Sequence, residues 1–197
     1  MQSVYDYLKK SGKEAELGTE AVYSPDGLIM DEPVIVLSSQ PIQSLSLYVA
    51  DGISCAATGG ILRFHYLVKL PREFKPGEAA LLTASTRAVK ENRVAGLFGG
   101  KISGVKWAGK NLAEALNKDE SLNRILLGCA TTTGEIDFTI DTLGSDEVHI
   151  WGPRFSDPLR LRDRFKAMEG LKEQECIFCF DTINRIATHI QDLISGK

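Results

Sequence analysis

Residues 176–194, near the C-terminus, constrain the fold more than any other stretch of the chain. Apolar residues recur there at spacings of three and four, which is the pattern of an amphipathic α-helix. The apolar stripe consists of Cys176, Phe180, Ile183, Ala187, Ile190 and Ile194, widened by Cys179, Ile186 and Leu193. So wide a stripe must be covered, either by the rest of the chain or by a second copy. A homodimer is therefore one expectation.

The composition is that of an ordinary globular protein. The 197 residues are 43% hydrophobic and 25% charged, which is enough for one substantial core without disulfides. The formal net charge of −3 argues against a general nucleic-acid or anionic-membrane binder. The N-terminus lacks the apolar segment of a signal peptide, and no apolar run approaches the ~18 residues that span a bilayer. We therefore expect a cytoplasmic protein whose four cysteines are thiols.

The order of strand and helix signals predicts an α+β fold. Between residues 34 and 107 the signals are mainly β, and in residues 62–70 apolar and polar side chains alternate as in a strand with one buried face. After residue 110 helical patterns dominate, interrupted by one β-hairpin. We expect a largely antiparallel sheet, with helices concentrated in the C-terminal half and a long amphipathic C-terminal helix. Residues 1–22 are assigned to a helix and a linker, and residues 23–197 to one domain, with a subdivision near 110 as the alternative.

One helix start is predicted from a single residue. Asp119 follows a short helical segment and precedes a second one, so its carboxylate is expected to cap the second helix. That second helix is expected to carry Leu122, Ile125 and Leu126.

The hairpin pattern predicts a register as well as two strands. Apolar sides of opposed strands match only if the loop has an odd number of residues. A three-residue loop at 143–145 satisfies this condition and places Ile140 opposite Val148. His149 and Trp151 then lie on the outer side of the hairpin.

Two cysteines form the only compact motif with candidate redox chemistry. Cys176 and Cys179 are three residues apart near the start of the C-terminal helix, where a helix dipole lowers a thiol pKa. The preceding residues 172–175 are acidic on balance, which has the opposite effect. Cys55 and Cys129 are isolated, whereas a structural zinc site normally shows two close pairs. The favoured interpretation is four buried core residues, with a redox dithiol or a metal site as alternatives.

Arginines crowd the start of a helix that Pro158 is expected to open. They are Arg154, Arg160, Arg162 and Arg164. Cations at a helix N-terminus are unfavourable unless an anion balances them, so a phosphate or carboxylate ligand is one interpretation. The other is a solvated face paired with nearby acids, namely Asp157, Asp163 and Glu169.

The outer side of the hairpin gathers Asp137, Asp141, Glu147 and His149, residue types that hold divalent cations or act as acid–base pairs. Exposed strands commonly carry such residues, so a solvated face is the favoured interpretation. Trp151 on the same side is more suggestive, because an exposed indole often marks a binding surface.

Two further motif comparisons fail. Residues 95–102 resemble a phosphate-binding loop, but Ala95 replaces its first glycine and Ile102 its hydroxyl residue. Ser54 lies in a sequence one residue short of a nucleophile elbow.

These observations favour a non-catalytic protein that binds a partner protein or a small anionic ligand through residues 151–164. Trp151, Arg154, Arg160 and Arg164 are the candidate ligand-binding residues. The alternative is a redox or metal-dependent enzyme or sensor that uses Cys176 and Cys179. No cofactor or resident metal is predicted.

Overall fold

The computed structural model describes residues 2–23, 29–38, 41–50, 61–90, 102–133, 138–144, 146–155 and 173–196. Within these ranges the chain forms four α-helices, which are α1 (Gln2–Lys10), α2 (Asn111–Lys118), α3 (Glu120–Thr133) and α5 (Glu173–Ser195). It forms eight strands, which are β1 (Ala15–Tyr23), β2 (Ile29–Leu37), β3 (Ile42–Ala50), β4 (Ile61–Lys69), β5 (Ala84–Lys90), β6 (Ile102–Gly109), β7 (Thr139–Leu143) and β8 (Glu147–Phe155).

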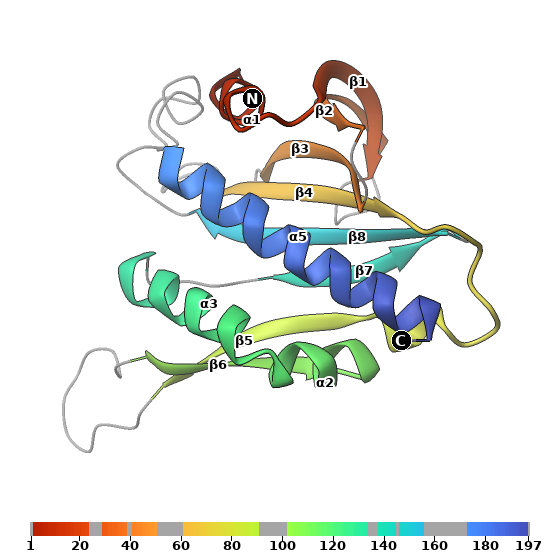
Figure 1. Ribbon diagram of the computed structural model, residues 1–197, viewed down its shortest axis with the longest axis vertical. Coiled ribbons are helices and arrows are strands. Elements are labelled where there is room, and N and C mark those ends of the chain that lie inside the picture. The colour runs from red at the N-terminus through yellow and green to blue at the C-terminus, as the bar shows by residue number, and fades with distance from the viewer. Residues whose placement is uncertain are drawn as a thin grey trace.

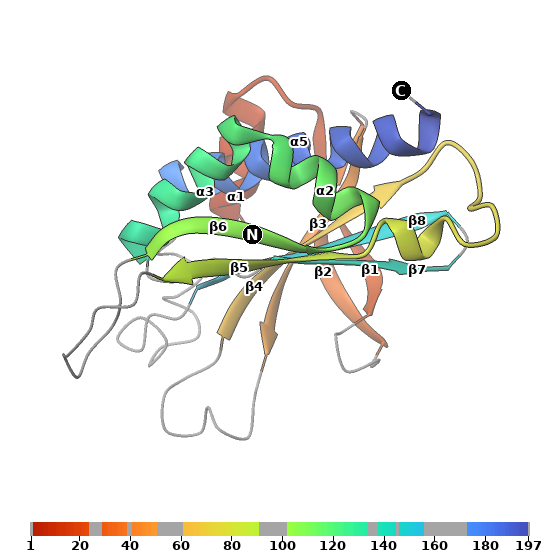
Figure 2. The ribbon, with the colours of Figure 1, turned by 90° about the horizontal axis from the view of Figure 1, so that it is seen from below.

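The strands make one sheet in the order β1-β2-β3-β4-β8-β7-β5-β6, with every neighbouring pair antiparallel. The sheet is strongly twisted, and all four described helices lie on one of its faces (Figure 1, Figure 2). The predicted α+β fold, with a largely antiparallel sheet and a long C-terminal helix, is confirmed. None of the described helices combines the length and the apolarity that crossing a membrane requires.

The hydrophobic core lies between the helices and the sheet. The apolar stripe of α5 is buried as its spacing predicts, through Phe180, Ile183, Ile186, Ala187, Ile190 and Ile194. It belongs to one cluster that also contains Val4 and Leu8 of α1 and Phe64 and Tyr66 of β4. Burying each large apolar side chain stabilises the fold by roughly 1.5–3 kcal/mol. From Phe180 onwards the stripe is thus covered within the chain, and this part of it does not require a second copy.

The C-terminal end of α5 is held by the segment that follows β4. Arg72 forks onto both carboxylate oxygens of Glu78, at 2.7 and 2.9 Å, and Nη2 also donates to the Ile194 carbonyl at 3.1 Å. The hydrogen bond from Arg72, with another from the backbone N–H of Lys75, lowers the pKa of Glu78 to about 2. A cation here suits the negative end of the helix dipole.

Asp119 caps α3 as predicted. The backbone N–H of Leu122 donates to Asp119 Oδ1 at 3.0 Å, which satisfies one of the free donors at the helix start. Leu122 and Leu126 are fully buried against β6, but Ile125 is 43% exposed. Of the three apolar residues that the sequence places on this helix, Ile125 is thus not part of the buried side of α3.

The segment predicted as a linker is largely a strand. α1 ends in a tight turn, with Gly12 at φ 74° and the N–H of Lys13 donating to the Leu8 carbonyl at 3.0 Å. β1 then begins at Ala15 and pairs with β2 at nine successive positions. Because β1 is an edge strand with exposed charged residues, its sequence lacks the clear alternation that identifies a strand.

The hairpin of β7 and β8 has the predicted parity but a different register. Its loop has three residues, 144–146, and Ile140 lies opposite Ile150 rather than Val148. Gly144 adopts φ 76°, a conformation that lets β7 continue to Leu143 before the chain turns. A shift of two residues leaves every side chain on its predicted face.

Candidate functional site

The face of the sheet that carries no described helix is polar and buried in the middle. Ser46 on β3, His65 on β4, and His149 and Trp151 on β8 are each at most 5% exposed. The prediction that Trp151 is exposed is therefore wrong. Alternation correctly places His149 and Trp151 opposite the helix side, but it does not reveal that this side is buried too. We call this surface, defined by Ser46, His65, His149 and Trp151, the His–Trp face.

The strand register brings these four residues together from distant parts of the chain. Ser46 lies opposite His65, and His65 lies opposite Trp151, so the three form one row across β3, β4 and β8. Residues directly opposite each other in an antiparallel pair share a face and lie close together. His149 belongs to the next row, where it lies between Leu67 and Asp141.

A chain of hydrogen bonds runs through the His–Trp face. Ser46 Oγ lies 3.1 Å from His65 Nδ1, and His65 Nε2 lies 2.9 Å from His149 Nδ1. In the contact between the two imidazoles, one nitrogen must donate and the other must accept. The tautomer of one histidine therefore fixes that of the other. The indole of Trp151 stacks on His65 with ring centroids 4.1 Å apart. These contacts fix the orientation of both imidazoles.

The series of hydrogen bonds ends at His149 Nε2, which has no hydrogen-bond partner within the described part of the protein. This nitrogen is buried, and the carboxylate Oε2 of Glu147 lies 3.8 Å away. Burial lowers the pKa of His149 to about 4, so this imidazole is neutral at pH 7 and the contact with Glu147 is not an ion pair. An unsatisfied buried polar atom costs about 1–3 kcal/mol and calls for an explanation.

The ladder of β4 and β8 places the backbones of two arginines opposite each other, in the row next to His65 and Trp151. Arg154, one of the predicted ligand-binding residues, lies directly opposite Arg63 of β4. The ladder has a register shift between Arg63 and His65, because β8 contains an extra residue at Gly152 and Pro153. Gly152 has φ 141°, and a proline is tolerated at such a bulge because its missing N–H breaks no ladder hydrogen bond. The bulge therefore sets Arg154 and Arg63 in the row next to His65 and Trp151.

The other predicted site residues lie outside the described part of the protein, or only their backbone is described. Arg160 and Arg164 lie outside the described residues, as does Cys55. The backbone of α5 includes Cys176 and Cys179, and that of α3 includes Cys129, but the positions of their side chains are outside the described part. Since α5 begins at Glu173, Cys176 lies in its first turn, as predicted.

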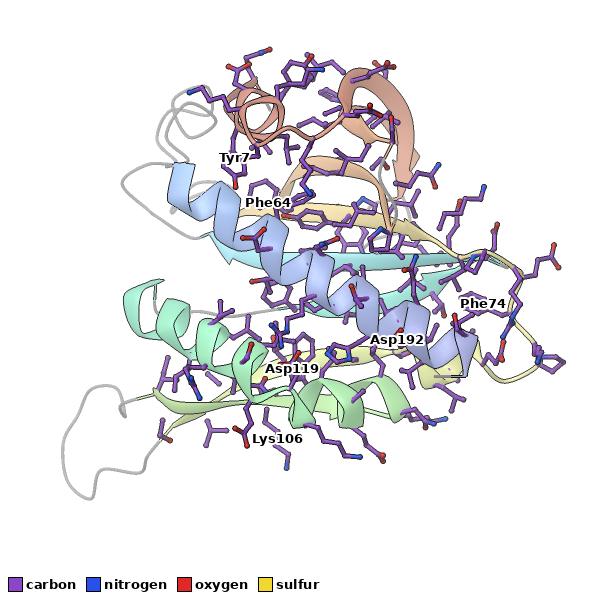
Figure 3. All side chains as sticks on the ribbon, viewed as in Figure 1. Tyr7, Phe64, Phe74, Lys106, Asp119 and Asp192 are labelled. Carbon is purple, nitrogen blue, oxygen red and sulfur yellow. The ribbon has the colours of Figure 1, made fainter. Side chains whose placement is uncertain are left out.

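A second charged cluster lies on the helix side. The carboxylate of Asp119, at the junction of α2 and α3 facing α5 (Figure 3), accepts hydrogen bonds from Arg185 Nη2 at 2.8 Å and His189 Nε2 at 2.9 Å. Burial raises the pKa of Asp119, but the hydrogen bonds from Arg185, His189 and the Leu122 N–H outweigh it, so the net pKa lies well below the usual range. Because internal donors occupy both oxygens, we interpret this cluster as a structural brace.

Among the described residues, the acidic side of the hairpin does not gather a metal site. Within the described ranges, no three histidine, cysteine or acidic side chains lie close enough to hold an ion. Asp137, which the sequence pattern includes in this group, lies outside those ranges.

Sequence reasoning misses Ser46, His65 and Arg63 as site residues. His65 occupies a polar position in a clear strand pattern, but only the register shows that it meets His149, 84 residues away.

No protein-family model matches the chain, and no curated protein or solved structure is significantly similar to it.

Proposed function

We propose that the protein binds a small anionic ligand, without catalysis, on the His–Trp face beside Arg63 and Arg154. The observation that carries this proposal is the placement of Arg63 directly opposite Arg154, one row from the buried pair of His65 and Trp151. The proposal keeps the predicted ligand class and two predicted residues, Trp151 and Arg154. It moves the site from an exposed helix start to the sheet.

Electrostatics supports an anion at this position. Like charges directly opposite each other in a ladder destabilise the sheet by up to about 1 kcal/mol. An anion between Arg63 and Arg154 converts that repulsion into attraction, and guanidinium forks bind carboxylates and phosphates through two parallel hydrogen bonds. The neighbouring row holds the strands rigid beneath the surface, because buried Trp151 stacks on buried His65. A preorganised site lowers the entropy that binding must offset.

The burial of Ser46 supports binding rather than catalysis. The order Ser46–His65–His149 has the connectivity of a nucleophile, a base and an orienting group. A nucleophile must reach its substrate, however, and Ser46 is only 2% exposed. The third group should also stabilise the charged base, and a histidine with a pKa of about 4 does this poorly.

The test compares binding of inorganic phosphate, citrate and adenosine monophosphate to three forms of the protein by calorimetry. We expect at least one probe to bind the unaltered chain, and Arg154→Gln to weaken that binding by about tenfold or more, which is ~1.4 kcal/mol. Without ligand, Arg154→Gln should be at least as stable as the unaltered protein, because it relieves the repulsion with Arg63.

Arg87→Gln is the matched control. Arg87 lies opposite Lys106 in the ladder of β5 and β6, and both residues are exposed. The Arg87→Gln substitution therefore removes one positive charge from a different pair of opposed cations. The affinity of this control variant for the probe should be unchanged. The proposal is wrong if no probe binds, if both variants weaken binding equally, or if a fluorophosphonate reagent labels Ser46.

The alternative function is a thiol-based sensor or enzyme. It is supported by the start of α5 at Glu173, which places Cys176 in the first helical turn, where the helix dipole favours a thiolate. Under this alternative, a coloured thiol reagent should titrate two thiols of the native protein at once. Thiols that react only after denaturation would contradict it and leave the cysteines as core residues.

A further inference from the structure

The two edges of the sheet differ in whether a side chain covers their outer backbone groups. β1 and β6 are the end strands of the described sheet, so each carries a row of backbone groups that no neighbouring strand satisfies. The edge of β6 is blocked at Trp107 by the side chain of Asn117. Asn117 Oδ1 accepts the Trp107 N–H at 2.9 Å, and Asn117 Nδ2 donates to the Trp107 carbonyl at 2.9 Å. The amide thus occupies the place of another strand.

The edge of β1 has no such cover among the described residues. The N–H of Ser38 donates to the Glu14 carbonyl at 3.3 Å, so the backbone groups of Glu14 face β2. Backbone groups alternate along an antiparallel strand, so those of Leu17 and Thr19 point away from β2. Thr19 is exposed, and Leu17 is 52% exposed. The outward N–H and C=O groups of these two residues are therefore available to an added strand.

A proline ends the pairing of β2 with β3, so part of the hairpin of β1 and β2 has no third strand. β1 pairs with β2 at nine positions, but β2 pairs with β3 only over Val34, Ile35 and Val36. The next position facing β3 is Pro33, which has no N–H to donate, so the ladder between β2 and β3 ends there. Beyond Val34 the hairpin of β1 and β2 continues as a two-stranded ribbon. Such a ribbon is only marginally stable by itself and gains from a third strand.

The charge of this hairpin selects the kind of strand that fits. Residues 14–23 and 29–38 contain no lysine or arginine, but they contain Glu14, Glu16, Glu20, Asp31 and Glu32. The backbone of Glu20 lies directly opposite that of Glu32 in the ladder, and like charges at opposed positions are unfavourable unless a cation balances them. A second copy of β1 would add further acids to this edge, so self-pairing is disfavoured.

We propose that the outer edge of β1 binds an extended basic segment of another protein as a ninth strand of the sheet. Leu17 and Thr19 supply main-chain hydrogen bonds, and the acids of the β1–β2 hairpin supply selectivity for lysine or arginine. This is the β-augmentation mode of peptide recognition, in which the backbone gives affinity and the side chains give specificity. The edge lies outside the His–Trp face and does not depend on the anion-binding proposal.

The first test uses hydrogen exchange with two synthetic seven-residue peptides that alternate valine with either lysine or glutamate. In the free protein the amides of Leu17 and Thr19 should exchange quickly, whereas those of Glu16 and Gly18, which face β2, should be protected. Adding the lysine peptide should slow exchange at Leu17 and Thr19 by about tenfold or more, and the glutamate peptide should have little effect. Equal effects of the two peptides, or none, would overturn the proposal.

The second test separates the backbone from the charge. Leu17→Pro removes only an outward N–H, so β1 should still pair with β2, but lysine-peptide affinity should fall by about tenfold or more. Leu17→Thr keeps the N–H and serves as its control. Replacing Glu16 and Glu20 with lysine should reverse the preference towards the glutamate peptide. A dimer in sedimentation that Leu17→Pro abolishes would assign the edge to a second copy and overturn the proposal, as would unchanged binding by that variant.

Discussion

Replacing Asp119 with alanine is expected to lower the free energy of unfolding by about 3 kcal/mol, among the largest effects of a single substitution outside the apolar core. The carboxylate is only 7% exposed and joins the start of α3 to α5. It caps α3 through the Leu122 N–H and accepts hydrogen bonds from Arg185 and His189 of α5. Alanine removes all of these contacts together.

The expected magnitude follows from what is left unpaired. Breaking a buried ion pair costs about 3–5 kcal/mol when the remaining charge stays buried, but Arg185 is 45% exposed and can be rehydrated. The lost cap adds about 1 kcal/mol, which brings the total back to about 3 kcal/mol. Urea denaturation of Asp119→Ala and of the unaltered protein at pH 7 measures the difference directly.

Two variants show whether the brace is the cause. Glu120→Ala removes an exposed acid from the adjacent position and should change stability by less than about 1 kcal/mol. Asp119→Asn keeps a capping side chain but loses the charge, so its cost should lie between those of the two alanine variants. A loss below about 1 kcal/mol for Asp119→Ala would show that the brace adds little to the apolar packing and the Arg72 contact that also hold α5.

The brace also predicts acid sensitivity. The folded-state pKa of Asp119 is lowered, so its contribution is fully present above its unfolded pKa and is lost progressively as the pH falls below about 4. The unaltered protein should lose more stability over this range than Asp119→Asn does. This pH range lies below the range between about 4 and 6.5 in which buried His149 affects stability, so the two effects can be separated.

Local patterns predict those parts of the fold that depend on local chemistry. The spacing in α5 identifies its buried stripe because a helix face repeats every three or four residues. The cap at Asp119 follows from one side chain and its place in the chain. Its bond to His189 does not follow, because 70 residues separate them and only the packing of α5 brings them together. The structure thus gives His189 a specific partner that its place on the helix does not reveal.

The candidate site is harder to predict because alternation says which face a residue occupies but not what covers that face. His149 and Trp151 lie on the predicted side of β8, yet both are buried. The meeting of Arg63 with Arg154 depends on a bulge at Gly152, which shifts the ladder by one residue. Neither the bulge nor the order of β4 and β8 in the sheet can be derived from periodicity. Site residues on neighbouring strands are therefore found only once the register is known.

Mild acid is expected to destabilise the protein through His149. Burial lowers the folded-state pKa of this residue to about 4, whereas an unfolded histidine titrates near 6.5. Between these values the unfolded chain binds more protons, so stability rises with pH across this window and falls as the pH drops through it. The loss should be about 1.3 kcal/mol between pH 7.5 and 5.5 and should approach about 3 kcal/mol below pH 4.

Urea denaturation at pH 7.5 and 5.5 tests this expectation with little interference from carboxylates, whose titration lies at lower pH. His149→Gln cannot titrate, but its amide can still form a hydrogen bond with His65. This variant should be less sensitive to pH than the unaltered protein by about 1.3 kcal/mol over the same interval. Equal sensitivity in the two proteins would mean that His149 is hydrated or paired when protonated. In that case the neighbouring Glu147, 3.8 Å from Nε2, would be the group that holds the added charge.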